Sequence, residues 1–335
     1  MVKTPCPKCG YLNPAAAACC TLCQAIFRAP EARPRRVPGG RRDFYSEQAG
    51  NRRLSWLLLS ALVLILGALG YAIGGAYGSA RSGLVICLAL GALSGAGAYL
   101  GGDRMLLAAS GAREVAPQAE PQLQNLVEEL CVASGLPKPR VYVIDSEAPN
   151  AFATGRSPAR ASIAVTTGLL KKLNRDELQG VLAHEMSHIR NLDVRFAMLV
   201  GILIGTVALL CDANLRSGRI ASRRRSRGGG GALILLALVL SILAPFASKL
   251  IQMAVSRRRE LLADASAVEL TRNPLALASA LRRIGTDPAP LGAANRATQH
   301  LYIVNPVKSF GMDSSALFST HPPIEARVRI LEAMA

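Results

Sequence analysis

Four long apolar stretches restrict the fold more than any other feature of this sequence. They cover residues 54–77, 84–101, 196–211 and 232–255. A membrane-spanning helix needs about 20 predominantly apolar residues, so the first and fourth stretches are long enough, the second barely is, and the third is short unless its ends are included. For the third stretch, a buried core helix is the alternative. We therefore predict a mainly α-helical membrane protein with transmembrane helices.

The composition favours a bilayer over nucleic acid as the partner of this basic chain. Half of the residues are hydrophobic, 18% are charged, and the formal net charge is +17. Arginines that flank apolar spans face anionic headgroups, which accounts for a basic charge in an apolar protein. Small residues in the second stretch also suit close helix contact inside a bilayer: Gly91, Ser94, Gly95 and Gly97. We expect contacts with membrane lipids and no nucleic-acid partner.

The arginines also predict an orientation in the membrane. Eight of them lie between residues 28 and 53, ahead of the first stretch, and a short turn at 81–83 returns the chain. The positive-inside rule then places the N-terminus and residues 102–195 in the cytoplasm, as in a multi-pass protein of the bacterial inner membrane. The arginine-rich segment 216–231 would be external, against this rule. Either its hairpin is shallow or the neighbouring spans override the charge bias, and the sequence leaves both open.

Two Cys-x-x-Cys pairs near the N-terminus predict a second kind of unit. Thiolates at this spacing suit tetrahedral zinc, and a cytoplasmic location disfavours the alternative of disulfides. A unit of residues 1–27 is too small for an apolar core, so a structural zinc would supply its folding energy. Residues 28–53 follow as a basic linker rich in Pro, Gly and Arg. The predicted ribbon ligands are Cys6, Cys9, Cys20 and Cys23, with Cys19 as the alternative to Cys20.

The segment "LAHEMSHI" carries the pattern that indicates chemistry. On a helix, His184 and His188 lie one turn apart on the same face. Two imidazoles in this arrangement can hold Zn²⁺, and Glu185 beside them can take a proton from a water at the metal. A catalytic zinc of this class also needs a third protein ligand and an open position.

The segment "SRRRELLADASAVEL" offers that third ligand. As a helix it places Glu260 and Asp264 on one face, four residues apart. Glu260 can ligate the metal, and Asp264 can accept the outer N–H of a ligating histidine. The alternative is a solvated charged face on which Glu260 pairs with Arg257 or Arg259.

Residues 139–170 predict a small sheet beside the metal helix. The segments 139–146 and 161–168 alternate and favour β-branched residues, and we expect 149–160 to join them as a turn-rich connection. An exposed edge strand of such a sheet can pair with an extended substrate through main-chain hydrogen bonds. A plain structural hairpin is the alternative.

Five motifs resemble those of a known family. They are "NAFATGR" at 150–156, "AVTTGLL" at 164–170, "LAHEMSHI" at 182–189, "SRRRELLADA" at 256–265 and "STHPPIEARV" at 319–328. From about residue 54 onward the chain resembles the HtpX-type integral-membrane zinc metalloproteases, which are related more distantly to the CAAX prenyl proteases. The predicted zinc ribbon does not belong to the usual pattern of that family.

The resemblance implies roles for individual residues. It makes His184, His188 and Glu260 the zinc ligands and Glu185 the catalytic base. It places His321 close to the active site, where this side chain could donate a hydrogen bond to the developing oxyanion. From the sequence itself, His321 can equally be a loop histidine before a helix. The resemblance also assigns part of the substrate-binding edge to Asn150 and Ala151.

These expectations combine into one domain plan and one activity. Residues 54–101 form two transmembrane helices, and 102–335 form the protease domain, which includes the stretches 196–212 and 232–255. The implied activity is a zinc metalloendopeptidase that cleaves membrane or unfolded proteins at the cytoplasmic face, in stress-linked quality control. A non-catalytic zinc scaffold that recruits partners through the ribbon and linker is the alternative. Cleavage of prenylated C-termini would need a large enclosed chamber, and four stretches are too few to build one.

Zinc content tests both predicted metal sites together. The purified full-length chain should hold two zinc ions, and removal of residues 1–30 should lower the count to one, because the ribbon thiolates leave with that segment. Elemental analysis of both proteins measures this. An unchanged count would contradict the ribbon site.

Overall fold

The computed structural model describes residues 3–5, 8–9, 12–14, 44–116, 118–221, 231–289 and 322–335. The chain divides into two units, 1–44 and 45–335. In the first unit, β1 (Lys3–Pro5) pairs antiparallel with β2 (Leu12–Pro14), so the two strands flank the first predicted cysteine pair. Cys9 is exposed. The other three predicted ribbon ligands, Cys6, Cys20 and Cys23, lie outside the described residues, and the ribbon zinc stays a prediction.

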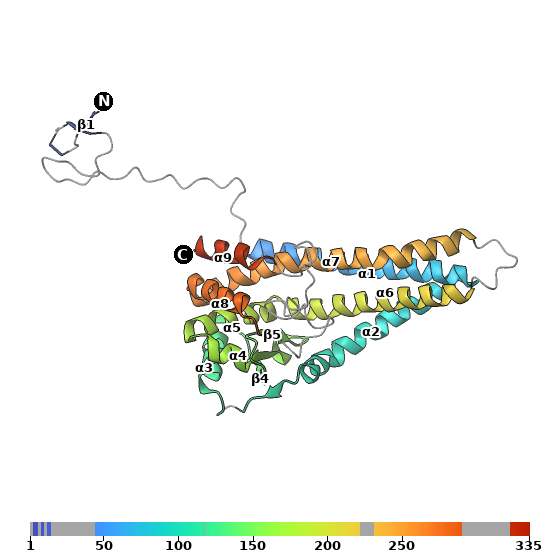
Figure 1. Ribbon diagram of the computed structural model, residues 1–335, viewed down its shortest axis with the longest axis horizontal. Helices are drawn as coiled ribbons and strands as arrows, with labels where there is room; N and C mark the ends of the chain where they lie inside the picture. The colour runs from blue at the N-terminus through green and yellow to red at the C-terminus, as the bar shows by residue number, and fades with distance from the viewer. Residues whose placement is uncertain are drawn as a thin grey trace. The chain divides into compact units, whose positions relative to one another are not determined.

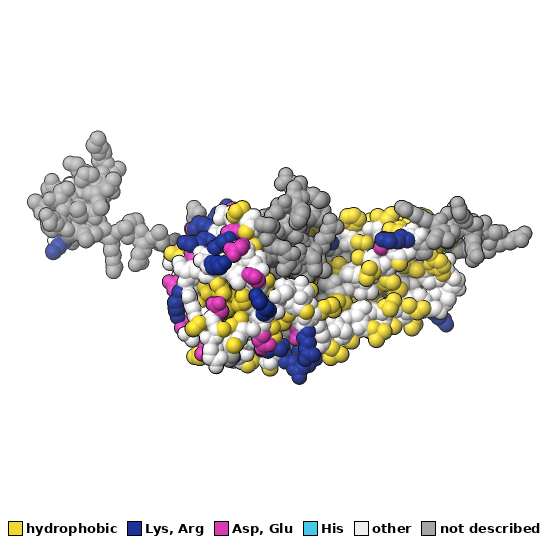
Figure 2. Space-filling model, turned by 60° about the horizontal axis from the view of Figure 1, so that its bottom comes forward, with side chains coloured by type: hydrophobic (Ala, Val, Ile, Leu, Met, Phe, Trp, Pro, Cys, Tyr) yellow, Lys and Arg dark blue, Asp and Glu magenta, His cyan; other side chains and the backbone are white. Residues whose placement is uncertain are grey.

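Four long helices dominate the second unit: α1 (Phe44–Ala76), α2 (Ala80–Ala109), α6 (Asp193–Ala221) and α7 (Gly231–Thr271). Each is long and apolar enough to cross a membrane, and they lie alongside one another (Figure 1). Figure 2 shows hydrophobic side chains over the long helices, whereas charged side chains gather over the sheet and the short helices. This distribution is what a bilayer around the long helices requires.

The third apolar stretch, predicted as residues 196–211, belongs to a longer helical span in α6. Its apolar span, Asp193–Arg216, has 24 residues, and only 28% of its most apolar window is buried within the protein. A buried core helix would be covered on most sides, so the length and low burial of α6 favour a membrane span over this alternative. The arginine-rich segment 216–231 lies largely outside the described residues.

The four spans share one apolar core. Buried side chains from all four helices form a single cluster: Leu62, Leu66, Leu69, Cys87, Val200, Leu203, Val207, Cys211 and Ala244. With 41 residues, α7 is about 60 Å long, roughly twice the thickness of a hydrocarbon core. Its C-terminal half therefore continues beyond the spans and carries Glu260 and Asp264 to the sheet and the short helices.

The closest approach of α1 and α2 is at glycines that the sequence analysis did not select. A Cβ added to Gly83 would lie 2.3 Å from the Gly70 carbonyl oxygen and 2.5 Å from the Gly74 Cα. Among the glycines expected at helix contacts, Gly91 packs on the end of the Leu66 side chain, whereas a Cβ on Gly97 would meet nothing within 4 Å. Backbone contact is therefore concentrated near the turn between the two helices.

The remaining described residues of the second unit surround a four-stranded sheet with the order β3-β4-β6-β5. Its strands are β3 (Arg113–Glu114), β4 (Arg140–Ile144), β5 (Ala151–Thr154) and β6 (Ser162–Thr166), with the 3-10 turn η1 (Pro158–Arg160) between the last two. Its helices are α3 (Pro121–Ser134), α4 (Thr167–Lys172), α5 (Arg175–Arg190), α8 (Pro274–Thr286) and α9 (Ile324–Glu332). A second apolar cluster joins α3, α5 and α8 to the sheet.

The expected turn-rich connection at 149–160 contains a strand, and that expectation is wrong. Residues Ala151–Thr154 form β5, which pairs antiparallel with β6 and lies at the edge of the sheet among the described strands. All residues of β5 and β6 are buried, so neither has the alternation that reveals a half-exposed strand. Because β4 and β6 pair in parallel, they are not the two arms of one hairpin.

Alanine substitutions on α2 test the close approach of the first two helices. Gly83→Ala should lower the Tm of the detergent-solubilised protein, since overpacking costs about 1–3 kcal/mol. Gly97→Ala on the same helix meets nothing and should leave the Tm equal or higher, because alanine favours the helix. Equal effects of the two substitutions would contradict the packing.

Candidate metal centre

The helix that carries the two histidines is fixed at its start and its end. Asn174 and Glu177 form a capping box at the N-terminus of α5. The buried Glu177 carboxylate also accepts a hydrogen bond from Ser279 at 2.6 Å, which ties α5 to α8. At the other end, Leu192 adopts a positive φ of 60° and breaks the helix before α6 begins at Asp193.

Three side chains converge beside the C-terminal half of this helix. The Nε2 atoms of His184 and His188 are 3.2 Å apart. One oxygen of Glu260 lies 3.6 Å from the His184 Nε2, and the other lies 3.6 Å from the His188 Nε2. Possible ligand atoms of the three residues all lie within 4.8 Å of one another. The fold thus brings together the three ligands predicted from the sequence.

This arrangement fits zinc. Tetrahedral zinc with bonds of about 2.0–2.1 Å separates its ligand atoms by about 3.4 Å, close to the observed separations. Two imidazoles and one carboxylate are also a known donor set for catalytic zinc, with a fourth position for water and substrate. Small adjustments of the side chains are enough to complete the geometry.

Each histidine is oriented by a second carboxylate through its outer nitrogen. The His184 Nδ1 lies 2.9 Å from an oxygen of Asp264, as the spacing on α7 suggested. The His188 Nδ1 lies 3.1 Å from an oxygen of Asp193, a residue that the sequence analysis did not select. Carboxylates in this position fix the tautomer that leaves Nε2 available to a metal.

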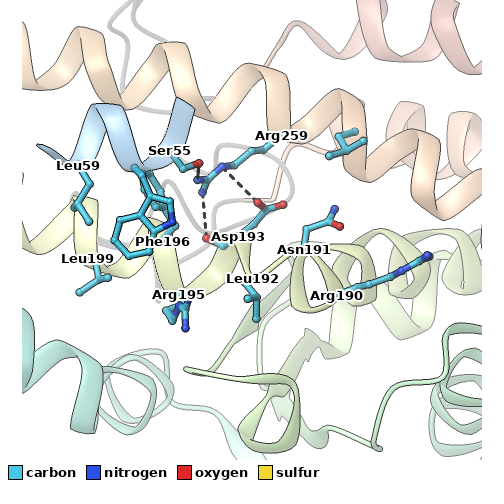
Figure 3. A pocket seen from close by; sticks show the side chains of 12 residues that line it. Ser55, Leu59, Arg190, Asn191, Leu192, Asp193, Arg195, Phe196, Leu199 and Arg259 are labelled. Carbon is cyan, nitrogen blue, oxygen red and sulfur yellow. Dashed lines mark hydrogen bonds and ion pairs between the residues drawn. The ribbon is translucent and has the colours of Figure 1, made fainter. Parts of the chain in front are cut away.

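Arg327 completes the ionic network from α9. Its guanidinium is 1% exposed and forms two hydrogen bonds to Asp264, at 2.8 and 2.7 Å. It also lies 3.1 Å from an oxygen of Glu260. In the alternative of a solvated charged face, Glu260 pairs with Arg257 or Arg259. Arg259 is instead paired with Asp193 (Figure 3).

The charges of this network favour a cation at the metal centre. Burial lowers the pKa of His184, but its contacts with Asp264 and Glu260 outweigh burial and raise that pKa to about 9. Burial alone would also lower the pKa of Arg327, yet the same two carboxylates raise it, so this arginine stays charged. The field that attracts a proton to the imidazole also attracts a metal ion, and a bound metal displaces that proton.

Glu185 lies between the histidines and the edge strand. Its carboxylate is buried, which raises its pKa, and it accepts a hydrogen bond from the backbone N–H of Ala153 on β5. Asn150 is buried just before β5, and its side-chain oxygen accepts the N–H of Ala151 at 3.0 Å. His321 lies outside the described residues, so its role stays a prediction.

Comparisons with known proteins agree with this geometry. The model of peptidase family M48 matches residues 117–335. A "Protease HtpX homolog" of Thermoanaerobacter pseudethanolicus is 44% identical and covers 88% of this chain and 99% of its own length. The "Protease HtpX homolog" of Dictyoglomus turgidum is 41% identical, and the alignment covers 87% of this chain and 95% of that protein. These relatives confirm the resemblance to the HtpX type, and they give no support to the alternative of a non-catalytic scaffold.

A solved structure shows a weaker similarity. The crystal structure of S. mikatae Ste24p aligns with a TM-score of 0.49 at 19% identity, and the alignment covers 85% of this chain and 67% of that one. A likeness at this level does not establish a shared fold.

Replacement of Asp193 tests the contact with His188. Asp193→Asn should weaken zinc binding about 10- to 100-fold, because the histidine loses the carboxylate that orients it. Competition with a chromophoric chelator measures the affinity. Asp212→Asn is the matched control, since Asp212 lies on the same helix and, among the described residues, its ion pair is with Arg216 on the exposed surface. Equal zinc affinities of the two variants would contradict the contact.

Proposed function

The chain belongs to peptidase family M48 and is a membrane metalloprotease, and on that premise we propose roles for its site residues. His184, His188 and Glu260 hold a catalytic zinc, and Glu185 is the general base of peptide-bond hydrolysis. The observation that carries this proposal is the convergence of the three ligand side chains, with the Glu185 carboxylate buried beside them.

The zinc, when bound, polarises the scissile carbonyl and acidifies the attacking water. Glu185 takes the proton of that water and later passes it to the leaving amine. Asp264 and Asp193 keep the two imidazoles in the ligating tautomer. Arg327 neutralises part of the negative charge around Glu260 and holds Asp264 in place.

The outer edge of β5 is the proposed docking site for an extended substrate, although the residues of this strand are buried and not exposed as the sequence predicted. In an antiparallel edge strand, the backbone N–H and C=O groups of successive residues point alternately toward the partner strand and toward the open edge. Because the Asn150 carbonyl accepts the N–H of Thr166 at 3.0 Å, the alternation turns Ala151 and Ala153 toward the edge. The hydrogen bond from Ala153 to Glu185 supports this orientation. A substrate strand added here would run past the catalytic base, and pairing through the main chain would accept many sequences.

We place the site at the cytoplasmic face of the bacterial inner membrane. The helix α5, which carries the two histidines, lies at the end of the spans where α1 begins and α2 ends (Figure 1). The arginines that precede α1 favour the cytoplasm for this end. The substrates proposed for this position are membrane proteins and unfolded segments close to the bilayer, in protein quality control. A second, structural zinc in the ribbon of residues 1–27 belongs to the same proposal.

A single substitution tests the assignment of the base. Glu185→Gln should lower the rate of casein cleavage or self-cleavage by about a hundredfold to ten-thousandfold, because it removes general base catalysis. The zinc content should not change, since the ligands remain. Glu128→Gln, an exposed position on α3, should cleave at the original rate. Cleavage by the Glu185 variant at the rate of this control would refute the assignment.

A further inference from the structure

A cavity of about 140 Å³ lies beside the metal centre and is not used by the proposed hydrolysis. Its walls come from the N-terminal part of α1, the end of α5, the start of α6 and the C-terminal half of α7. Figure 3 shows its labelled side chains. A cavity of about 150 Å³ holds a molecule of the size of benzene. The space therefore suits one small group and is too small for a folded partner.

The cavity lies at the level where headgroups meet the spans. The apolar span of α1 begins at Arg53, and that of α6 begins at Asp193. Ser55, Trp56 and Phe196 line the cavity within a turn of these starts. The Trp56 side chain is 57% exposed, and tryptophan is enriched at the boundary between hydrocarbon and water.

The polar part of the cavity is cationic. Three arginines line it against one acidic residue, Asp193. Arg259 forms the floor, where it pairs with Asp193 at 3.4 Å and lies 4.0 Å from the centre of the Phe196 ring. Arg190 pairs with Glu269 at 3.4 Å.

Arg195 is the cation available to a ligand. Within the part of the chain that the structure describes, no hydrogen bond or ion pair engages its guanidinium, which is partly exposed at the cavity. An anion at this position would gain a charge-assisted hydrogen bond without breaking an existing pair.

The apolar part of the lining comes mainly from the membrane-facing helices, with Leu59 on α1 and Phe196 and Leu199 on α6, and Leu262 adds to it from the part of α7 beyond the spans. A cationic end at headgroup level and an apolar end along the spans match the phosphate and the first acyl carbons of a phospholipid. A peptide fits less well, because helices build the lining and no strand edge is present among the described lining residues for main-chain pairing.

We propose that this cavity binds the headgroup phosphate of an anionic phospholipid, with Arg195 as the residue that pairs with it. The excess of positive side chains selects an anionic lipid over a zwitterionic one. The site is separate from the proposed catalysis, although Asp193 borders both the cavity and His188.

The chain contains one tryptophan, so intrinsic fluorescence reports on the cavity directly. The full-length protein is reconstituted in phosphatidylcholine vesicles that contain increasing fractions of brominated phosphatidylglycerol or brominated phosphatidylcholine, whose bromines quench Trp56 on contact. We expect the anionic lipid to quench at a lower mole fraction. Arg195→Gln should raise the fraction needed about fivefold, the amount expected for one arginine near a membrane surface.

Arg104→Gln is the matched control. It removes the same charge from the end of α2 that lies on the same side of the spans, but Arg104 does not line the cavity. Equal quenching by the two lipids, or equal shifts in the two variants, would overturn the proposal. So would reversal of the quenching by inorganic phosphate, because the ligand would then be a soluble anion. The measurement does not depend on protease activity, and it can therefore fail while the proposed function holds.

Discussion

The buried ionic network around His184 is the interaction on which the rest of this structure depends. Arg327 and Asp264 are each 1% exposed and Glu260 is 5% exposed. An ionised group in such a position costs several kcal/mol unless it is paired and hydrogen-bonded. One guanidinium is hydrogen-bonded to Asp264 and ion-paired with Glu260, and Asp264 orients the imidazole. Because the partners come from α5, α7 and α9, the network fixes three helices relative to one another.

The same network joins the metal centre to the membrane helices. α7 is long enough to cross the bilayer and still carry Glu260 into the protease part. Asp193 is the first residue of α6, and its contact with His188 connects a second span to the metal helix. Arg259 donates a hydrogen bond to Ser55 on α1 and pairs with Asp193. Three of the four long helices therefore contribute to the position of the ligands, and the protease part is not a soluble domain tethered by an anchor.

The parts of the site that the sequence predicted are those with local geometry. Helical spacing places His188 one turn after His184, and Asp264 one turn after Glu260, whatever the rest of the fold does. Because a catalytic zinc needs a third protein ligand, the histidine pair predicts that a carboxylate elsewhere, here Glu260, completes the site. The apolar stretches predicted the spans for the same reason, because length and hydropathy are local properties.

The missed features depend on geometry that no local pattern carries. Asp193 faces His188 only because the chain breaks at Leu192. Arg327 is 63 residues away from Asp264 along the chain, and only packing of α9 brings them together. The strand β5 has four buried residues, and a strand without exposed positions shows no alternation.

The balance of buried charge explains why these residues belong to one site. Four carboxylates lie around the two histidines, and two guanidiniums oppose them: Glu185, Asp193, Glu260 and Asp264 against Arg259 and Arg327. The excess equals two negative charges, the charge that one Zn²⁺ offsets. A neutral replacement for either arginine would enlarge that excess in a region where burial makes charge costly. The two arginines therefore neutralise part of the carboxylate charge. The negative charge that remains is enough to attract a divalent cation and small enough for the helices to stay packed.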